Sequence, residues 1–576
     1  MTSSDPILGR RVLRRWISLV SFLMLPVVAA AAPAPEIIKM PGELERWVQV
    51  KADEFVIFSN AGKSKTKEIA EHLLRFRAAL AKASKLPIHS PLPISVYAFK
   101  STSAFAPYRD IILERRAKNV AGFFIHAWDG PLIVFDASGR WSAEHVIYHE
   151  LTHAFIGNQG VSVPLWLREG AADFYAAFAI QDGSAKIGLP TGQIALLRKR
   201  EWVPLAEVLA ADSRSPLYTD AKRAPLFYAE SWAMVHYLYA DCPQRRGQLA
   251  SYLEQLAAGR SDEQAFASAF GTGFDAFEKE LKAYINGDAM QYLVLRGDQL
   301  GPINVDTPTA LPHDEVLARL GYLLLEGSRA SFPSAEAFLT QAFKFNPHNV
   351  TALTGLGIAR EREGRIEEGW KLYQRALEFA PDDVRPDLHA AEALLDRLEK
   401  GNPPSRADAE FARDLLWRAL KHSPNLALGW AALGRTYVLA GDKDTGAGVD
   451  ALERCLALDA QDYAAARDLI VLCVRAGRIE RAVEVNGRFL AACNDAAVVR
   501  TAHEALLQGN LDRAERLLAE GQLDDALAMA EQAVRTAHDW QAGNALVERA
   551  AALRDRVRTA RQQIAAGRKP EETNER

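Results

Sequence analysis

The sequence predicts an α+β domain followed by an all-α solenoid. Short strand-like runs occur before residue 136, and apolar residues then recur with helical spacing from about residue 141. Beyond residue 312, similar segments recur 34 residues apart, which is typical of stacked helical hairpins. A chain of 576 residues is too long for one hydrophobic core. We therefore expect an N-terminal export segment over 1–32, a mixed domain over 41–290, repeats over 312–540 and a polar tail over 560–576.

Composition excludes some classes of protein. The formal net charge is -4, so no overall positive field favours nucleic acid as a partner. The four cysteines are too few and too scattered for a disulfide framework, and none has the spacing of a thiolate metal site.

The N-terminus has the pattern of a secretory signal. Four arginines within residues 10–15 precede an apolar run from Trp16 to Ala30, and Ala29–Ala32 offers small residues for cleavage. An uncleaved single-span anchor is the alternative, although the run is short for a bilayer. We expect an exported protein, periplasmic or extracellular, with a membrane tether only if this segment is retained.

The sheet subregion, 41–136, contains four short strand candidates. Phe55–Phe58 and Ile94–Phe99 flank an amphipathic helix over Lys65–Lys85. Gly122–His126 and Leu132–Phe135 surround Asp129-Gly130, which is a hairpin turn signal. Together these elements predict a small mixed sheet.

The helical subregion, 141–290, begins with a helix over Trp141–Phe155. Pro164 is expected to open the next helix, since proline is well tolerated at a helix start. A third helix, rich in aromatic residues, is expected over Leu226–Tyr239.

The third region matches the tetratricopeptide pattern. Pro347 and Pro381 end two similar segments, and Gly364 and Gly477 lie at expected turns between helices. The pattern predicts five or six helix pairs, with an irregular insertion around 401–404. Each pair buries its face on its neighbours, so the predicted solenoid offers a concave surface to a protein partner.

The helix over Trp141–Phe155 carries His149-Glu150-Leu-Thr-His153. Residues four apart share one helix face, so His149 and His153 can bind one metal ion, and Glu150 can reach a water on that metal. Glu169, on the next helix, would complete three protein ligands and leave the fourth position of Zn²⁺ open. This is the HExxH pattern of zinc peptidases.

Several further residues are candidates for the site or for the core. Asp173 lies one turn after Glu169 and is expected to accept a hydrogen bond from the ring of His149. His145 shares the face of His149, but we expect a packed or solvent-contacting side chain there. His126 either lines the cleft or lies on a hairpin surface, the second being favoured, and His236 is expected in the core.

The motif together with Pro164-Leu-Trp-Leu-Arg-Glu169-Gly-Ala-Ala-Asp173-Phe-Tyr resembles the gluzincin metallopeptidases, specifically the peptidase MA-like domains of exported bacterial proteins. The resemblance covers about residues 48–290 and implies a zincin-like fold. It also implies His149, His153 and Glu169 as zinc ligands and Glu150 as the catalytic base. In gluzincin aminopeptidases a tyrosine on a later helix stabilises the oxyanion, and Tyr228 occupies a similar place, with simple packing as the alternative.

The sequence therefore favours an exported zinc metallohydrolase, most simply a peptidase, whose repeats recruit a protein partner or substrate. One alternative is a tetratricopeptide interaction scaffold with a structural or catalytically idle metal site. Another is zinc hydrolysis of an amide outside a peptide. Leu132–Phe135 is either a substrate-binding edge strand or an ordinary sheet edge.

Overall fold

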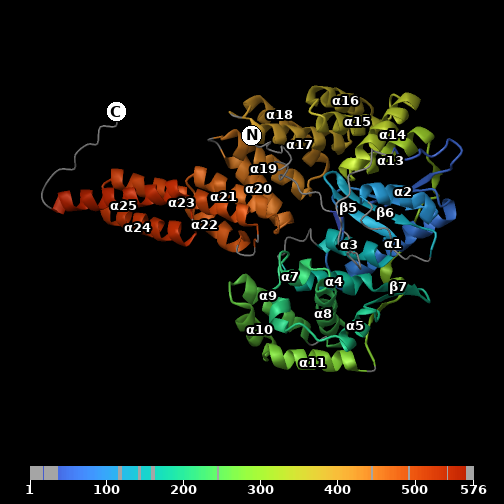
Figure 1. Ribbon diagram of the computed structural model, residues 1–576, viewed down its shortest axis with the longest axis horizontal. Helices are drawn as coiled ribbons and strands as arrows, with labels where there is room; N and C mark the ends of the chain where they lie inside the picture. Colours follow the sequence, from blue (N-terminus) through green and yellow to red (C-terminus); the bar gives the residue numbers. More distant parts are fainter. Residues whose placement is uncertain are drawn as a thin grey trace, which may run out of the picture. The chain divides into compact units, whose positions relative to one another are not determined.

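The computed structural model describes residues 17–18, 37–114, 120–139, 144–156, 163–242, 245–287, 289–401, 403–442, 445–490, 493, 495–540 and 542–565 (Figure 1). Apart from Ile17–Ser18, the predicted export segment therefore lies outside the described residues. The chain forms two compact units, one of residues 1–396 with 417–426 and the other of 397–416 with 427–576. None of the described helices combines the length and apolar character that a bilayer crossing requires.

The first unit is built on a seven-stranded mixed sheet with the order β1-β5-β6-β4-β3-β2-β10. Strands β3, β4 and β6 pair in parallel, and the other neighbours are antiparallel. The strands are β1 (Ile17–Ser18), β2 (Val48–Ala52), β3 (Phe55–Ser59), β4 (Ile94–Phe99), β5 (Gly122–Ala127), β6 (Gly130–Asp136) and β10 (Thr309–Ala310).

Both faces of this sheet are buried. In β4, Ile94 and Val96 belong to the main core on one face, whereas the Tyr97 hydroxyl donates to the carbonyl of Arg319 on the other, at 3.1 Å. Successive side chains of a strand point to opposite faces, so a strand buried on both sides needs a continuous apolar run. The run of the predicted strand Ile94–Phe99 has this character.

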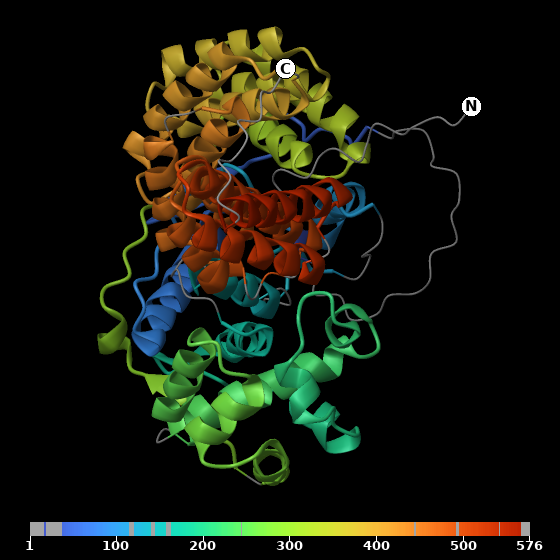
Figure 2. The ribbon, with the colours of Figure 1, turned by 90° about the vertical axis from the view of Figure 1, so that its left-hand side faces the viewer.

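Helices of the α+β domain cover one face and carry the candidate site. The Phe76 ring of α1 stacks on the Tyr148 ring of α3, with ring centroids 4.2 Å apart. In Figure 2 the first repeats (yellow) lie at the top and the later helices of this domain (green) at the bottom. The helices of this group are α1 (Lys63–Ser84), α3 (Glu144–Ile156), α4 (Leu165–Ala176), α5 (Gln193–Lys199), α6 (Leu205–Leu209), α7 (Pro216–Thr219), α8 (Ala224–His236), η2 (Tyr237–Asp241), α9 (Arg246–Ala257), α10 (Asp262–Phe270) and α11 (Phe274–Asn286).

A second, three-stranded sheet lies within the region predicted as helical. It has the order β7-β8-β9, with β7 (Phe178–Gln181), β8 (Ser184–Ile187) and β9 (Leu293–Leu295), and the short helix α12 (Gly297–Leu300) follows. The sequence prediction missed it because these strands are only three or four residues long. Their pairing also joins segments more than 100 residues apart, for which no local pattern exists.

The opposite face of the main sheet packs against α2 and the first repeat helices. Helix α2 (Thr102–Ile112) meets the repeats where Tyr108 lies edge-on to Phe338, with ring centroids 6.4 Å apart. The Ser328 hydroxyl also donates to the carbonyl of Ile111 at 2.9 Å. The first repeats are therefore part of the same compact unit as the sheet.

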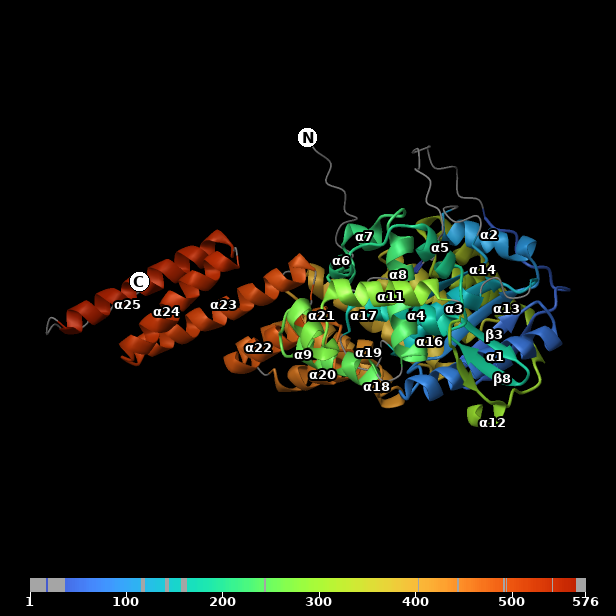
Figure 3. The same cartoon turned by 90° about the horizontal axis from the view of Figure 1, so that it is seen from below.

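The repeat region consists of antiparallel helix pairs, as the 34-residue period predicts. Figure 3 shows the last three helices, in the second unit, running alongside one another. The helices are α13 (His313–Leu325), η4 (Arg329–Ser331), α14 (Phe332–Phe345), α15 (Val350–Arg362), α16 (Ile366–Phe379), α17 (Val384–Lys400), α18 (Arg406–His422), α19 (Ala427–Ala440), α20 (Gly446–Leu458), α21 (Tyr463–Arg475), α22 (Ile479–Val485), η5 (Asn486–Leu490), α23 (Ala496–Ala519), α24 (Leu523–Asp539) and α25 (Asn544–Ala565).

Three local expectations differ from the structure. Strand β6, which contains Leu132–Phe135, lies between β5 and β4, so its proposed role as an edge strand is wrong. The predicted insertion around 401–404 is the connection between α17 and α18. Helix α25 continues to Ala565, past the start of the predicted polar tail, because Ala550, Leu553 and Val557 bury an apolar stripe against α23 and α24.

Candidate metal centre

Helix α3 is fixed by its apolar face. Tyr148, Leu151 and Phe155 are buried in the main core, and this packing sets the rotation of the helix. His149 is buried with them, at 2% exposure, while the His153 side chain lies one turn further and is 19% exposed. Because the two imidazoles share one face of a fixed helix, they converge without any long-range constraint.

Helix α4 brings the carboxylate. It packs closely on α8 at Gly170, where a Cβ atom would lie 2.3 Å from the carbonyl oxygen of Ser231. Any larger residue would separate the two helices. Glu169, adjacent to this contact, is 3% exposed, so its carboxylate is buried.

The ligand atoms of the two helices meet at one point. Nε2 of His149 and Nε2 of His153 are 3.0 Å apart. Oε2 of Glu169 lies 3.5 Å from the first nitrogen and 3.3 Å from the second. Ligands at zinc bond lengths around a tetrahedral centre lie about 3.3–3.6 Å from one another. The two distances to Glu169 fall in this range, and the distance between the nitrogens is slightly shorter. The donor set of two imidazole nitrogens and one carboxylate oxygen therefore suits Zn²⁺ in chemistry and comes close to it in spacing.

Asp173 orients the first imidazole. Nδ1 of His149 is 2.8 Å from Oδ1 of Asp173, so the proton of the neutral ring lies on Nδ1 and the lone pair of Nε2 faces the cluster. Gln193 donates to the other oxygen of Asp173 at 2.6 Å. His145, with its side chain 44% exposed, lies 3.3 Å from Oδ1 of Asp173. The same carboxylate thus serves three partners.

A second group, His145, His149 and Asp173, also brings three possible ligand atoms together. There, however, the 2.8 Å separation of His149 from Asp173 is that of a hydrogen bond, with a proton between the atoms. The carboxylate is an orienting group in this geometry. The cluster of His149, His153 and Glu169 is the better candidate for a metal centre.

The carboxylates of the cluster favour positive charge, either as protons on the imidazoles or as a bound cation. Burial acts against the charge of Glu169, but His153 and His149 outweigh it and hold the pKa of Glu169 well below its usual range. Burial likewise opposes the charge of Asp173, and hydrogen bonds from His145 and His149 lower its pKa. Burial lowers the pKa of His149, yet Asp173 and then Glu169 raise it well above the usual value. Two ionised carboxylates therefore face the imidazoles.

The predicted catalytic residues lie beside the cluster. Glu150 is 2% exposed on α3, between the two histidines in sequence. The Tyr228 ring, on α8, is centred 6.3 Å from the His149 ring, and burial, followed by the charge of Glu169, raises the pKa of its hydroxyl. Tyr228 thus remains a neutral donor at ordinary pH. The roles of these residues, like those of the ligands, stay predictions.

Tyr218 was missed by the sequence prediction. Its hydroxyl lies 3.5 Å from Oε1 of Glu169, and its ring is centred 5.9 Å from that of Tyr228. Arg168 donates to the same Oε1 atom at 3.4 Å. Tyr218 lies on the four-residue helix α7, and Gln193 begins another short helix, so neither had a periodic pattern that pointed to the site.

The remaining histidines divide between site and core. His126 lies half-buried on β5, and burial, with the charge of His153, lowers its pKa to about 4. His126 is thus a partly buried hairpin residue, and whether it lines the cleft stays a prediction. His236 is fully buried, and its ring bonds the Tyr284 hydroxyl and the carbonyl of Gly188, at 2.6 Å and 2.7 Å. The prediction of a core histidine there is confirmed.

Residues 144–262 match a family model described as "Protein of unknown function (DUF1570)". This span contains both histidines of the motif and the acidic residues that follow. The description assigns no activity.

The chain is also similar to "Cellulose synthase operon protein C" of Xanthomonas axonopodis pv. citri (strain 306). The two are 31% identical over 198 residues, which cover 34% of this chain and 13% of that protein. The chain thus matches only a small part of this curated relative.

Two solved structures show weaker likeness. A thermophilic TPR protein of Thermus thermophilus, TTC0263, has a TM-score of 0.26 and 21% identity, over 34% of this chain and 99% of that chain. A human IFIT1 dimer with PPP-AAAA has a TM-score of 0.21 and 16% identity, over 67% of this chain and 93% of that chain. These scores are too low to support a shared overall fold, so the repeat architecture rests on the helix pairs of this chain.

Proposed function

We propose that this protein is an exported zinc-dependent hydrolase, most simply a peptidase, carried on a helical repeat scaffold. The observation that carries the proposal is the convergence of His149, His153 and Glu169, with ligand atoms 3.0–3.5 Å apart. Export is inferred from the arginine-rich and apolar N-terminal segment.

The residues around the cluster have the roles that amide hydrolysis needs. Zinc, when bound, would polarise the scissile carbonyl and make a water acidic near neutral pH. Glu150 would take a proton from the attacking water and return it to the leaving amine. Tyr228 would donate a hydrogen bond to the developing oxyanion, with the Tyr218 hydroxyl nearby. Asp173 would hold the His149 ring in the required tautomer.

The second candidate is a repeat scaffold whose metal site is structural or catalytically idle. The comparisons fit this simpler function better, because the repeats form a large part of the chain and none of the matches named above is described as a peptidase. A buried glutamate beside the ligands is what favours the hydrolase, since a structural zinc needs no general base.

The test compares the zinc-loaded wild type with Glu150→Gln on a denatured protein mixture, with new peptide termini counted by mass spectrometry. Removing a general base should lower the cleavage rate by about 100- to 10,000-fold while zinc binding persists. Glu144→Gln, on the same helix but outside the cluster, is the matched control and should cleave like the wild type. Equal cleavage by wild type and Glu150→Gln would mean contamination. No cleavage by any zinc-loaded form would favour the scaffold.

A further inference from the structure

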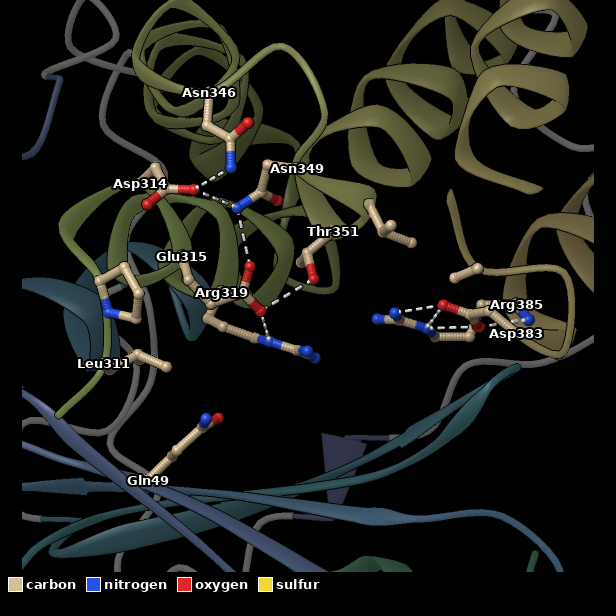
Figure 4. Close-up of a pocket in the computed structure, with 13 residues that line it drawn as sticks. Gln49, Leu311, Asp314, Glu315, Arg319, Asn346, Asn349, Thr351, Asp383 and Arg385 are labelled. Carbon is tan, nitrogen blue, oxygen red and sulfur yellow. Dashed lines mark hydrogen bonds and ion pairs between the residues drawn. The ribbon is translucent and has the colours of Figure 1, made fainter. Parts of the chain in front are cut away.

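A pocket of about 470 Å³, lined mainly by polar and charged residues, lies between the main sheet and the first repeats, away from the metal cluster. Its lining comes from strand β2, the segment before α13, and the N-terminal ends of α13, α15 and α17, all within the first compact unit. Figure 4 shows Gln49 rising from the sheet and Arg319 and Arg385 approaching from the helices.

The acidic groups of the pocket are already occupied. Five of the six carboxylate oxygens of Asp314, Glu315 and Asp383 accept hydrogen bonds. Their donors include Asn346 and Asn349, which hold Asp314 at 2.9 Å. These carboxylates form a layer behind the pocket surface and have little capacity left for a cationic ligand.

The two guanidinium groups are held but not saturated. Arg319 donates through Nε to Glu315 at 2.6 Å and lies over the Phe58 ring, 4.7 Å from its centroid. Arg385 donates through Nε and Nη2 to Asp383 and lies 5.7 Å from the Tyr322 centroid. Among the described residues, no hydrogen-bond partner is present for Nη1 and Nη2 of Arg319 or for Nη1 of Arg385.

This geometry is preorganised for an acceptor. A carboxylate behind each arginine and an aromatic ring beneath it restrict the side chain, so little conformational entropy is lost on binding. Figure 4 shows the free ends of both guanidinium groups directed toward the open space, where the Gln49 amide also points. The uncommitted hydrogen-bonding groups at the centre of the pocket are therefore mainly N–H donors.

We propose that this pocket binds a carboxylate group of a polypeptide, held by the free guanidinium ends of Arg319 and Arg385 with Gln49 as a further donor. Arginine pairs with carboxylates through parallel N–H···O bonds, which gives this ligand class both strength and direction. The site is independent of the metal centre and of any hydrolytic activity. It would give the repeat scaffold a preference for acidic segments or for a free chain end.

The experiment measures binding to the full chain by isothermal titration calorimetry with four probes. Acetyl-Gly-Asp-Glu-Gly-amide offers side-chain carboxylates only, and acetyl-Gly-Asn-Gln-Gly-amide is its neutral counterpart. Acetyl-Gly-Gly-Ala-Ala with a free carboxyl end offers a terminal carboxylate only. Inorganic phosphate tests for general anion binding. At least one carboxylate peptide should bind at least about tenfold more tightly than the neutral peptide.

Two variants place that binding in the pocket. Arg319→Gln should lower the affinity for the peptide by about tenfold or more, because it removes a charge-assisted hydrogen-bond pair. Gln49→Glu should weaken it through like-charge repulsion, and since Gln49 is a half-buried strand residue with no buried ion pair, this variant should fold even if the first does not. Arg375→Gln is the matched control, because Arg375 also lies over an aromatic ring, 5.3 Å from the Phe343 centroid, outside the pocket.

Binding of either carboxylate peptide that falls in the folded pocket variants and persists in Arg375→Gln supports the proposal, and the two peptides distinguish a side chain from a chain end. The proposal is overturned if phosphate alone binds, if no peptide binds, or if binding is the same in wild type, Gln49→Glu and every folded arginine variant.

Discussion

Two buried clusters in the first unit contain the same chemical groups in different arrangements. At the metal centre, two imidazoles and Glu169 direct their acceptor atoms toward one point. At the junction of the β5–β6 turn with the repeats, His389 contacts the Tyr322 hydroxyl at 3.0 Å and Asp129 at 3.4 Å, and its other nitrogen faces Glu392 at 3.6 Å.

The two clusters differ in whether each hydrogen-bond acceptor has a donor within the protein. In the junction each acceptor has a donor, because Tyr322 also donates to Asp129, and the cluster is complete as a protein ion pair. At the candidate metal centre the Nδ1 proton of His149 is committed to Asp173, so loss of the second ring proton leaves an Nε2 lone pair facing an ionised carboxylate. Convergent acceptors of this kind need a cation, whereas a closed pair does not.

The largest expected effect is a loss of folding stability when the ion pair at the junction is broken. Asp129→Ala leaves His389 buried beside Tyr322 without its main carboxylate, and breaking a buried ion pair typically costs about 3–5 kcal/mol. Urea unfolding of the first unit measures the loss. Asp53→Asn is the control, since Asp53 is 58% exposed in its pair with Arg77, and exposed pairs contribute about 1 kcal/mol or less. Asparagine also tolerates the positive φ of 50° at this position. If Asp129→Ala lowers the free energy of unfolding by no more than the control does, the junction does not contain a stabilising ion pair.

A smaller effect is expected at the metal centre when the orienting group is changed. Asp173→Asn should weaken zinc binding by about 10- to 100-fold, because the amide holds the His149 ring less firmly than a carboxylate. Competition with a fluorescent chelator measures the affinity. Gln193→Ala removes only the hydrogen-bond donor behind Asp173, so it should lower the zinc affinity less than Asp173→Asn does. An affinity unchanged in Asp173→Asn would remove the orienting role.

The most gradual effect is the dependence of the junction's stability on pH. Burial lowers the pKa of His389, but Asp129 and Glu392 raise it to about 9. Since the folded pKa lies above the unfolded value of about 6.5, the stabilisation is complete below pH 6.5 and is lost as pH rises through 9. Asp129, with its pKa lowered to about 2, stays ionised throughout.

Urea unfolding of wild type between pH 6.5 and 10 should therefore show a falling stability, with a slope of at most about 1.4 kcal/mol per pH unit from this group. The other groups around His389, besides Asp129 and Glu392, are the Arg385 guanidinium and Glu361, and burial raises the pKa of Glu361 to about 8. His389→Gln should flatten the slope. An identical slope in both proteins would show that His389 does not carry the charge.

Much of the candidate metal centre was predictable because its geometry is local. His149 and His153 lie one helical turn apart, and Glu169 and Asp173 are likewise one turn apart on the following helix. The same holds for the repeats, whose 34-residue period follows from each helix pair packing on its neighbour. Strands such as Ile94–Phe99 were also predicted with their observed bounds.

The remaining parts of the fold and of the candidate site depend on contacts between segments far apart in the sequence, which no short segment encodes. Tyr322 and Asp129 are 193 residues apart, and the position of β6 inside the sheet depends on β5 and β4 together. Tyr218 and Gln193 reach the metal centre from short helices whose placement is set by tertiary packing. Sequence periodicity reports which face of an element is buried, but not which distant element covers it.

The most direct measurement is the zinc content of purified protein by mass spectrometry of the metal, after equilibration with zinc and removal of the excess. We predict close to one zinc per chain in the wild type and in His145→Ala, whose side chain lies outside the ligand set. His153→Ala and Glu169→Ala should lose most of it while remaining folded by circular dichroism. Equal zinc in all four proteins, or none in the wild type, would contradict the assignment of these three residues as a metal centre.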